Sequence, residues 1–140
     1  MNPLLVLDIE KQEEMDMPPK KVLIVDDETA ILFAFVKVLT TPGLNIYTAQ
    51  TLARGLELIR KEVFCAVIAD LRLTELGGNE GYEVIKAASE KCKDCRIIVM
   101  TAHGDENTRK QIFSLGAHFY MQKPVSPHKV KEILDSMGIA

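Results

Sequence analysis

The chain has 140 residues, a length that predicts one domain. Hydrophobic residues make up 47% of it and charged residues 26%, values close to those of average globular proteins, so the composition excludes wholesale disorder or a fibrous repeat. The formal net charge is −3, and no block is dense in lysine and arginine. A nucleic-acid backbone or an anionic membrane is therefore not expected as the main partner.

The cysteines and the N-terminus indicate the compartment. The chain has three cysteines, a small and odd number, which argues against a disulfide scaffold and indicates a reducing environment. The first residues lack a basic region and a small-residue cleavage site, and no apolar stretch approaches the roughly 20 residues of a membrane span. We expect a cytoplasmic protein with reduced thiols, exposed at Cys92 and Cys95 and in the core at Cys65.

Residues 1–19 differ in charge from the rest of the chain. They hold one lysine against five acidic residues and end in the pair Pro18-Pro19, which no helix continues through. We expect an acidic, mobile leader at residues 1–19, followed by a domain at residues 20–140.

Short apolar runs alternate with longer amphipathic stretches from there on. In chain order, the runs predict strands at residues 22–25, 44–49, 64–69, 97–100 and 118–121. Apolar residues at helical spacing predict helices near residues 31–39, 52–59, 84–88, 112–115 and 130–137. Except for the run at 44–49, the predicted strands are continuously apolar, so we expect them to be buried on both faces.

This alternation is typical of a parallel sheet with helices on both faces and right-handed crossovers. Five strands within about 120 residues predict an α/β fold of the flavodoxin-like, doubly wound kind. The expected strand order is 2-1-3-4-5.

The carboxyl ends of the predicted strands carry an unusual set of polar residues. In chain order, the set is Asp26, Asp27, Glu28, Asp70, Thr101 and Lys123. In such sheets, ligands bind beyond these ends, near the point where the strand order reverses. Asp27 or Glu28 could instead simply cap the next helix. Capping does not require an acidic pair, a second distant acid and a lysine together, so we favour a ligand site.

Three carboxylates at one edge repel one another and need cations. Lys123 supplies one charge, and a donor set made only of oxygens favours a hard ion, usually Mg²⁺. A carboxylate can also accept a phosphoryl group as a nucleophile, and Asp70 is the best candidate because it stands alone at the end of the central strand. Phosphoryl transfer needs alignment and charge neutralisation, which Mg²⁺, Lys123 and the Thr101 hydroxyl would supply.

At these residues the sequence resembles the receiver domain of a two-component response regulator of the single-domain, chemotaxis-regulator-like kind. The resemblance covers roughly residues 20–138. Its motifs are VLIVDDE at 22–28, DLRL at 70–73, GYEVI at 81–85, MTA at 100–102, GA at 116–117 and KP at 123–124.

The resemblance implies a role for each matching acidic position. Asp26 and Asp27 would form the acidic Mg²⁺ pocket, and Asp70 would be the phosphoacceptor as well as a metal ligand. The backbone carbonyl of Arg72 would complete the protein ligands.

The resemblance also implies phosphate-binding and switch residues. Thr101 would bind the phosphoryl group and shift when it arrives, Ala102 would be the small residue beside it, and Lys123 would bind a phosphate oxygen. Tyr120 falls at the aromatic switch position of the family, although without the family it could be an ordinary strand residue. The Lys123-Pro124 peptide bond would be cis.

The chain departs from the family pattern after Asp70. Thr74 stands where the family usually has proline, and the expected glycine comes at Gly81, about three positions late. Residues 73–80 therefore form a lengthened loop beside the site, where it could affect docking of the donor and the lifetime of the phosphate.

The resemblance implies a phosphoprotein that acts as a regulatory switch and not as an enzyme that turns over a substrate. Its only chemistry would be self-phosphorylation and autodephosphorylation. The donor would be a sensor histidine kinase or a histidine phosphotransferase. We expect the signal to pass to a separate effector, or through a homodimer, by the face of the fourth helix, fifth strand and fifth helix. A receiver-like binding module that works without phosphorylation is the main alternative. A metal-dependent phosphatase is disfavoured because Arg72 replaces its usual second acid.

Overall fold

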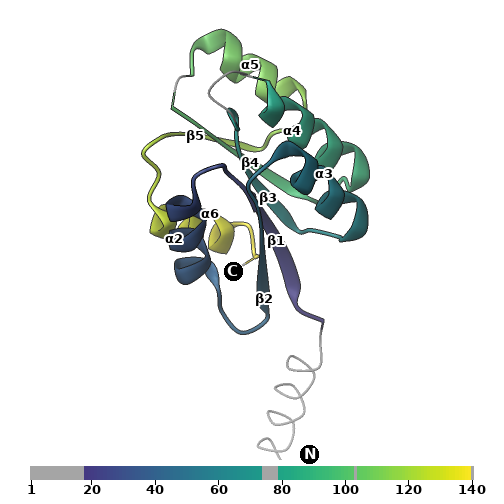
Figure 1. Cartoon of the computed structure of the whole chain (residues 1–140), viewed down its shortest axis with the longest axis vertical. Helices are drawn as coiled ribbons and strands as arrows, with labels where there is room; N and C mark the ends of the chain where they lie inside the picture. The colour runs from purple at the N-terminus through teal and green to yellow at the C-terminus, as the bar shows by residue number, and fades with distance from the viewer. Residues whose placement is uncertain (1–17, 74–78, 103, 140) are drawn as a thin grey trace, which may run out of the picture.

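The computed structural model describes residues 18–73, 79–102 and 104–139. Residues 1–17 of the expected leader and residues 74–78 of the lengthened loop lie outside the described part of the chain. The elements are β1 (Lys20–Val25), α2 (Thr29–Leu39), β2 (Leu44–Ala49), α3 (Leu52–Lys61), β3 (Ala66–Asp70), α4 (Glu80–Lys91), β4 (Arg96–Thr101), α5 (Glu106–Ser114), β5 (Phe119–Gln122) and α6 (Pro127–Ser136) (Figure 1).

The five strands form one parallel sheet in the order β2-β1-β3-β4-β5 (Figure 1), which confirms the predicted topology. The order reverses at β1, where β2 lies on one side and β3 on the other. The carboxyl ends of β1 and β3 therefore lie next to each other at the switch point, where open α/β sheets bind their ligands.

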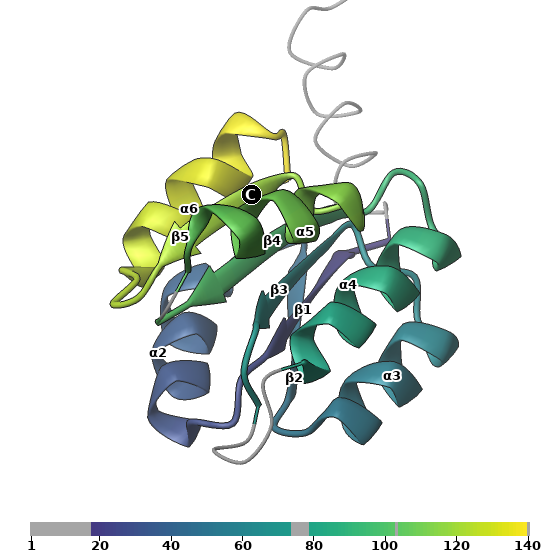
Figure 2. The ribbon, with the colours of Figure 1, turned by 90° about the horizontal axis from the view of Figure 1, so that it is seen from above.

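Helices cover both faces of the sheet (Figure 2). The α3, α4 and α5 helices pack on one face with residues that include Leu58, Ile85 and Ile112. The α2 and α6 helices pack on the other face, with Phe35 and Leu134 fully or almost fully buried. The apolar positions at helical spacing are thus the core faces of these helices, and the central strands are buried on both sides.

Two details of the predicted strands were wrong. Phe64 and Cys65 precede β3, which begins at Ala66, although Phe64 is buried. The strand β5 is not buried on both faces, since Phe119 is 40% exposed and Tyr120 is half-buried. It is one of the two edge strands and pairs with β4 alone, so its neighbours cover it only in part.

The cysteines also differ from expectation. All three are free thiols, but Cys95 is buried at 3% exposure, and Cys65 and Cys92 are half-buried. Cys95 packs into the core beneath α3 and α4, and this burial raises its pKa to about 12. A thiol in such surroundings is poorly reactive. Across the described ranges, no helix is long and apolar enough to cross a membrane.

Candidate metal and phosphoacceptor site

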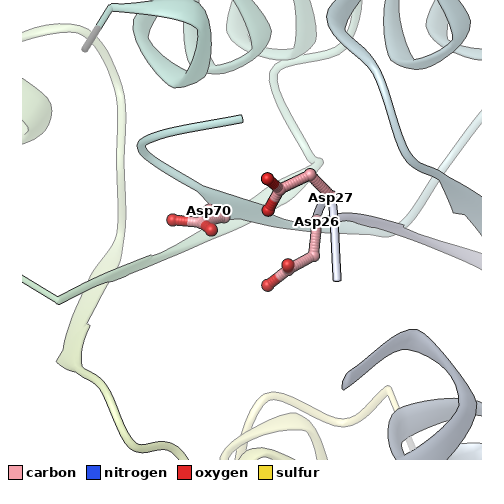
Figure 3. A group of neighbouring side chains, drawn as sticks. All are labelled: Asp26, Asp27 and Asp70. Carbon is pink, nitrogen blue, oxygen red and sulfur yellow. The ribbon is translucent and has the colours of Figure 1, made fainter. Parts of the chain in front are cut away.

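Two neighbouring strands bring three carboxylates together. Val25 pairs with Ala69 in the β1–β3 ladder, so Asp26 and Asp70 occupy the next position on each strand. Asp27 follows directly, and one oxygen from each of the three carboxylates lies within 4.8 Å of the others (Figure 3). The structure thus places the three predicted acids at one point of the sheet edge.

Backbone amides orient the two buried carboxylates. Asp26 is fully buried and Asp70 is 6% exposed, whereas Asp27 is exposed. The Glu28 amide donates to Asp26 Oδ1 over 2.9 Å, and the Arg72 amide donates to Asp70 Oδ1 over 3.2 Å. Each carboxylate therefore has one oxygen held by the turn that follows its strand.

Lys123 provides the cation of the site. Its Nζ donates to Asp26 Oδ2 and to Asp70 Oδ2, each at 2.9 Å, and only 14% of its side chain is exposed. Its backbone amide donates to the Thr101 carbonyl over 2.8 Å, which anchors the end of β5 to β4. The Lys123-Pro124 peptide bond is cis.

Burial and neighbouring charges shift the pKa values of Asp70 and Lys123. Burial raises the pKa of Asp70, and the charge of Asp26 raises it further, while Lys123 opposes both effects. Burial would lower the pKa of Lys123, but its bonds to Asp70 and Asp26 outweigh this and raise the pKa. The ammonium thus stays charged, and its single positive charge is fewer than the three carboxylates of the cluster. A donor set made only of carboxylate oxygens, with excess negative charge, fits a hard divalent cation such as Mg²⁺.

The remaining predicted residues surround this cluster. Thr101 is 2% exposed and follows Met100, the register partner of Asp70, while Ala102 is exposed at the start of the next loop. Glu28 precedes α2, but its side chain makes no capping hydrogen bond and reaches to 4.0 Å from Lys123. Glu28 thus starts α2 as its N-cap residue, as the alternative held, but it does so through its backbone carbonyl and not through its side chain.

Gly81 supports the site in a way that the sequence analysis did not recognise. A Cβ at Gly81 would lie 2.5 Å from Leu71 Cα and 2.7 Å from the Asp70 carbonyl oxygen. The Gly81 amide donates to the Leu71 carbonyl over 3.0 Å. The start of α4 thus packs directly on the backbone that carries Asp70, although the loop before it is lengthened. The available signal was a glycine at the first turn of a helix that follows the acidic strand end.

An apolar hollow of about 230 Å³ adjoins the site. Ala30, Ile31 and Ala34 of α2 line one side of it, and Pro124 and Val125 line the other. Lys123 also contributes to the wall, so the hollow and the carboxylate cluster share this side chain.

Comparison with known proteins agrees with this geometry. The model of the response regulator receiver domain family matches residues 22–135. The alginate biosynthesis transcriptional regulatory protein AlgB of Pseudomonas putida is 32% identical over 111 residues, which are 79% of this chain and 24% of that protein. This chain thus spans about a quarter of that relative's length.

Solved structures show the same fold. A CheY-like receiver domain protein from Methanospirillum hungatei superposes with a TM-score of 0.73 and 31% identity, over 86% of this chain and 97% of that one. A response regulator from Burkholderia pseudomallei, solved with a phosphorylated aspartic acid, a calcium ion and citrate, superposes with a TM-score of 0.70 and 26% identity. That match covers 79% of this chain and 64% of the other. From the matched domain, the strand order and the acidic cluster together, we conclude that this chain belongs to the response regulator receiver domain family.

Proposed function

We propose that Asp70 accepts a phosphoryl group and that residues 20–140 act as the receiver switch of a two-component system. The observation that carries the proposal is the ammonium of Lys123 held between Asp26 and Asp70 beside a third carboxylate. Phosphorylation on an aspartate is general to the receiver family. The related structure from Burkholderia pseudomallei contains a phosphorylated aspartic acid, which supports the assignment by similarity.

The donor would be a phosphohistidine of a sensor histidine kinase or of a histidine phosphotransferase. A carboxylate oxygen of Asp70 attacks phosphorus, the new O–P bond forms as the N–P bond breaks, and the leaving imidazole takes up a proton. Lys123 then neutralises a phosphoryl oxygen, the Thr101 hydroxyl bonds to another, and the small side chain of Ala102 leaves room beside the group. The open hollow beside Lys123 is the side from which we expect the donor to approach.

The residues that would hold Mg²⁺ are the carboxylates of Asp26, Asp27 and Asp70 and the backbone carbonyl of Arg72. Receiver domains generally bind Mg²⁺ at an acidic pocket, and the carboxylate oxygens here lie close enough together for one ion. When bound, Mg²⁺ would neutralise charge on the transferring phosphoryl group. Water attack on the aspartyl phosphate would reset the switch, so the domain regulates rather than turns over a substrate.

The signal would leave through the face made by α5, β5 and α6. Phe113 is 38% and Phe119 is 40% exposed there, and the Arg109 guanidinium lies 5.8 Å from the centre of the Phe113 ring. Exposed aromatic and arginine side chains are typical of protein interfaces. We expect a separate effector protein or a second copy of the chain to bind this face. We expect this binding to take place in the cytoplasm, and we treat residues 1–19 as an acidic leader that is not part of the domain.

Acetyl phosphate with Mg²⁺ tests the proposal. The intact mass should increase by one phosphoryl group in the natural chain and in Asp94→Asn, whose exposed carboxylate lies far along the chain from the site, but not in Asp70→Asn. An equal mass increase in Asp70→Asn would refute the acceptor assignment. No increase in any chain would favour the phosphorylation-independent binding module, and sustained hydrolysis of a small phosphoester would favour a phosphatase.

A further inference from the structure

The side chain of Tyr120 ends against the backbone of Gly104. Tyr120 lies in β5, is half-buried, and packs against the core beneath α3, α4 and α5. Gly104 lies in the loop between β4 and α5. A Cβ at Gly104 would overlap Tyr120 Oη and would lie 2.6 Å from Tyr120 Cζ. The phenol thus occupies the space that the first side-chain carbon of any other residue would take.

The backbone at Gly104 does not itself call for glycine. Of the glycines in the described ranges, Gly43, Gly116 and Gly138 have positive φ, and Gly104 is not among them. An alanine at position 104 would therefore meet no backbone strain of that kind. Glycine is needed at this position because the Tyr120 phenol occupies the space that a Cβ would take.

Thr101 borders the same space. The Cβ that Gly104 lacks would lie 3.1 Å from Thr101 Cγ2. The Thr101 methyl group, the Gly104 backbone and the Tyr120 phenol thus meet at one point, between the end of β4 and the edge strand. A change at Gly104 would reach Tyr120 directly, without passing through the carboxylate cluster.

We infer that Gly104 is a positioning residue. Because it has no side chain, it leaves free the space that the Tyr120 phenol fills when it points inward, and so it sets the fraction of time for which the phenol points inward. This inference rests on the proposed function in one respect only: it treats Tyr120 as the residue that couples phosphorylation at the site to the face made by α5, β5 and α6. Because Tyr120 lies on an edge strand and is already half-exposed, its ring can rotate outward when the inward place is filled.

The variant Gly104→Ala tests this in the full chain without any phosphoryl donor. The chain has three tyrosines and no tryptophan, so 3-fluorotyrosine labelling places one ¹⁹F resonance at each of Tyr47, Tyr82 and Tyr120. We expect the Tyr120 resonance to move to a solvent-exposed position, with the ratio of inward to outward phenol falling about tenfold or more, as overpacking predicts. The Tyr47 and Tyr82 resonances should stay in place. An unmoved Tyr120 resonance in a folded Gly104→Ala chain would overturn the inference.

A double-variant cycle separates the phenol from the loop. In urea unfolding, Gly104→Ala should lower the midpoint of the natural chain but leave that of Tyr120→Ala unchanged, because the clashing group is then absent. Equal shifts in both backgrounds would assign the effect to the loop and contradict the inference. Tyr120→Phe should give an intermediate result, since Cζ remains after Oη is removed.

The outcome is independent of the phosphoacceptor assignment. Mass increase with acetyl phosphate reports on Asp70, whereas the ¹⁹F resonance reports on Tyr120 with no phosphate present. A missing mass increase together with a displaced Tyr120 resonance would refute the proposed function and leave the role of Gly104 in place. A normal mass increase with an undisplaced resonance would do the reverse.

Discussion

The Lys123 ammonium donates to Asp70 Oδ2 over 2.9 Å, although 53 positions separate the two residues in the chain. The lysine follows the edge strand β5, and its ammonium reaches the last residue of β3. The same ammonium bonds to Asp26, so one cation serves two buried carboxylates. The stability of the domain and the chemistry of the site therefore depend on the same contacts.

Replacing the proposed phosphoacceptor should stabilise the fold. The pKa of Asp70 is raised, mainly by burial, so the folded chain holds its proton more tightly than the unfolded chain, and ionisation costs stability as the pH rises through that pKa. Asp70→Asn removes the charge yet keeps an oxygen that accepts from Lys123. In urea titrations at pH 7.5 with chelator, we expect the free energy of unfolding to rise by on the order of 1 kcal/mol. The gain should shrink in acid, and a lower stability than that of the natural chain would contradict this account.

Removing the cation should have the opposite effect. Lys123→Met leaves Asp26 and Asp70 facing each other without an ammonium, which should cost about 3–5 kcal/mol, the usual loss when one partner of a buried ion pair is removed. Millimolar Mg²⁺ should restore part of that loss, because the ion replaces the missing positive charge. Thermal unfolding with and without Mg²⁺ measures both effects. The matched control Lys123→Arg keeps the charge and should lose less, and equal losses in the two variants would argue against an electrostatic cause.

The packing of Gly81 on the Asp70 backbone predicts a contrast between two glycines. At Gly81 a Cβ would press on backbone atoms of Leu71 and Asp70 that cannot rotate away, so Gly81→Ala should lose about 1–3 kcal/mol and should respond more weakly to Mg²⁺. At Gly55, inside α3, a Cβ would touch the Val25 methyl groups at 3.4 and 3.5 Å, an ordinary contact. Gly55→Ala should therefore be neutral or stabilising, helped by the higher helix propensity of alanine. Equal losses in both variants would show that the close approach at Gly81 is relaxed easily.

His118 should make stability fall in mild acid. Its Nδ1 accepts from the Ile97 amide over 3.0 Å, and its own amide donates to the Ile97 carbonyl over 2.8 Å. Only an unprotonated Nδ1 can accept, so the neutral ring supplies a hydrogen bond at the start of the β4–β5 ladder. Partial burial, and then the charge of Arg96, lowers the pKa of His118. A lowered histidine pKa contributes stability that is complete above the unfolded value and is lost as the pH falls through it.

His118→Asn is the matched variant, because its amide oxygen can accept the Ile97 hydrogen bond but does not titrate. Between pH 7.5 and pH 5.5, the natural chain should lose about a few tenths of a kcal/mol relative to this variant, since solvent screens the exposed ring. Paired urea titrations at the two pH values measure the difference. A constant difference across this range would show that protonation of His118 leaves the ladder intact.

Local sequence determined much of this protein. Continuous, largely β-branched apolar runs gave correct places for β1 and β4, because such runs fit a buried parallel sheet. Their alternation with amphipathic helices limited the topology to the order that the structure shows, since right-handed crossovers leave few arrangements. The residues at the strand ends followed from the same reasoning, because parallel strands end at one edge. The roles of Asp26, Asp27, Asp70 and Arg72 at that edge stay predictions.

Only the tertiary structure decided which groups touch. Lys123 bonds to both Asp26 and Asp70, Gly81 lies against the Asp70 backbone, and Tyr120 fills the space beside Gly104. Burial likewise depended on neighbours far along the chain, which is why Cys95 is buried and β5 is partly exposed, against expectation. Side-chain type and spacing are local properties that a sequence displays directly. Distance, burial and free space arise from packing between distant segments, so they exist only once the chain has folded.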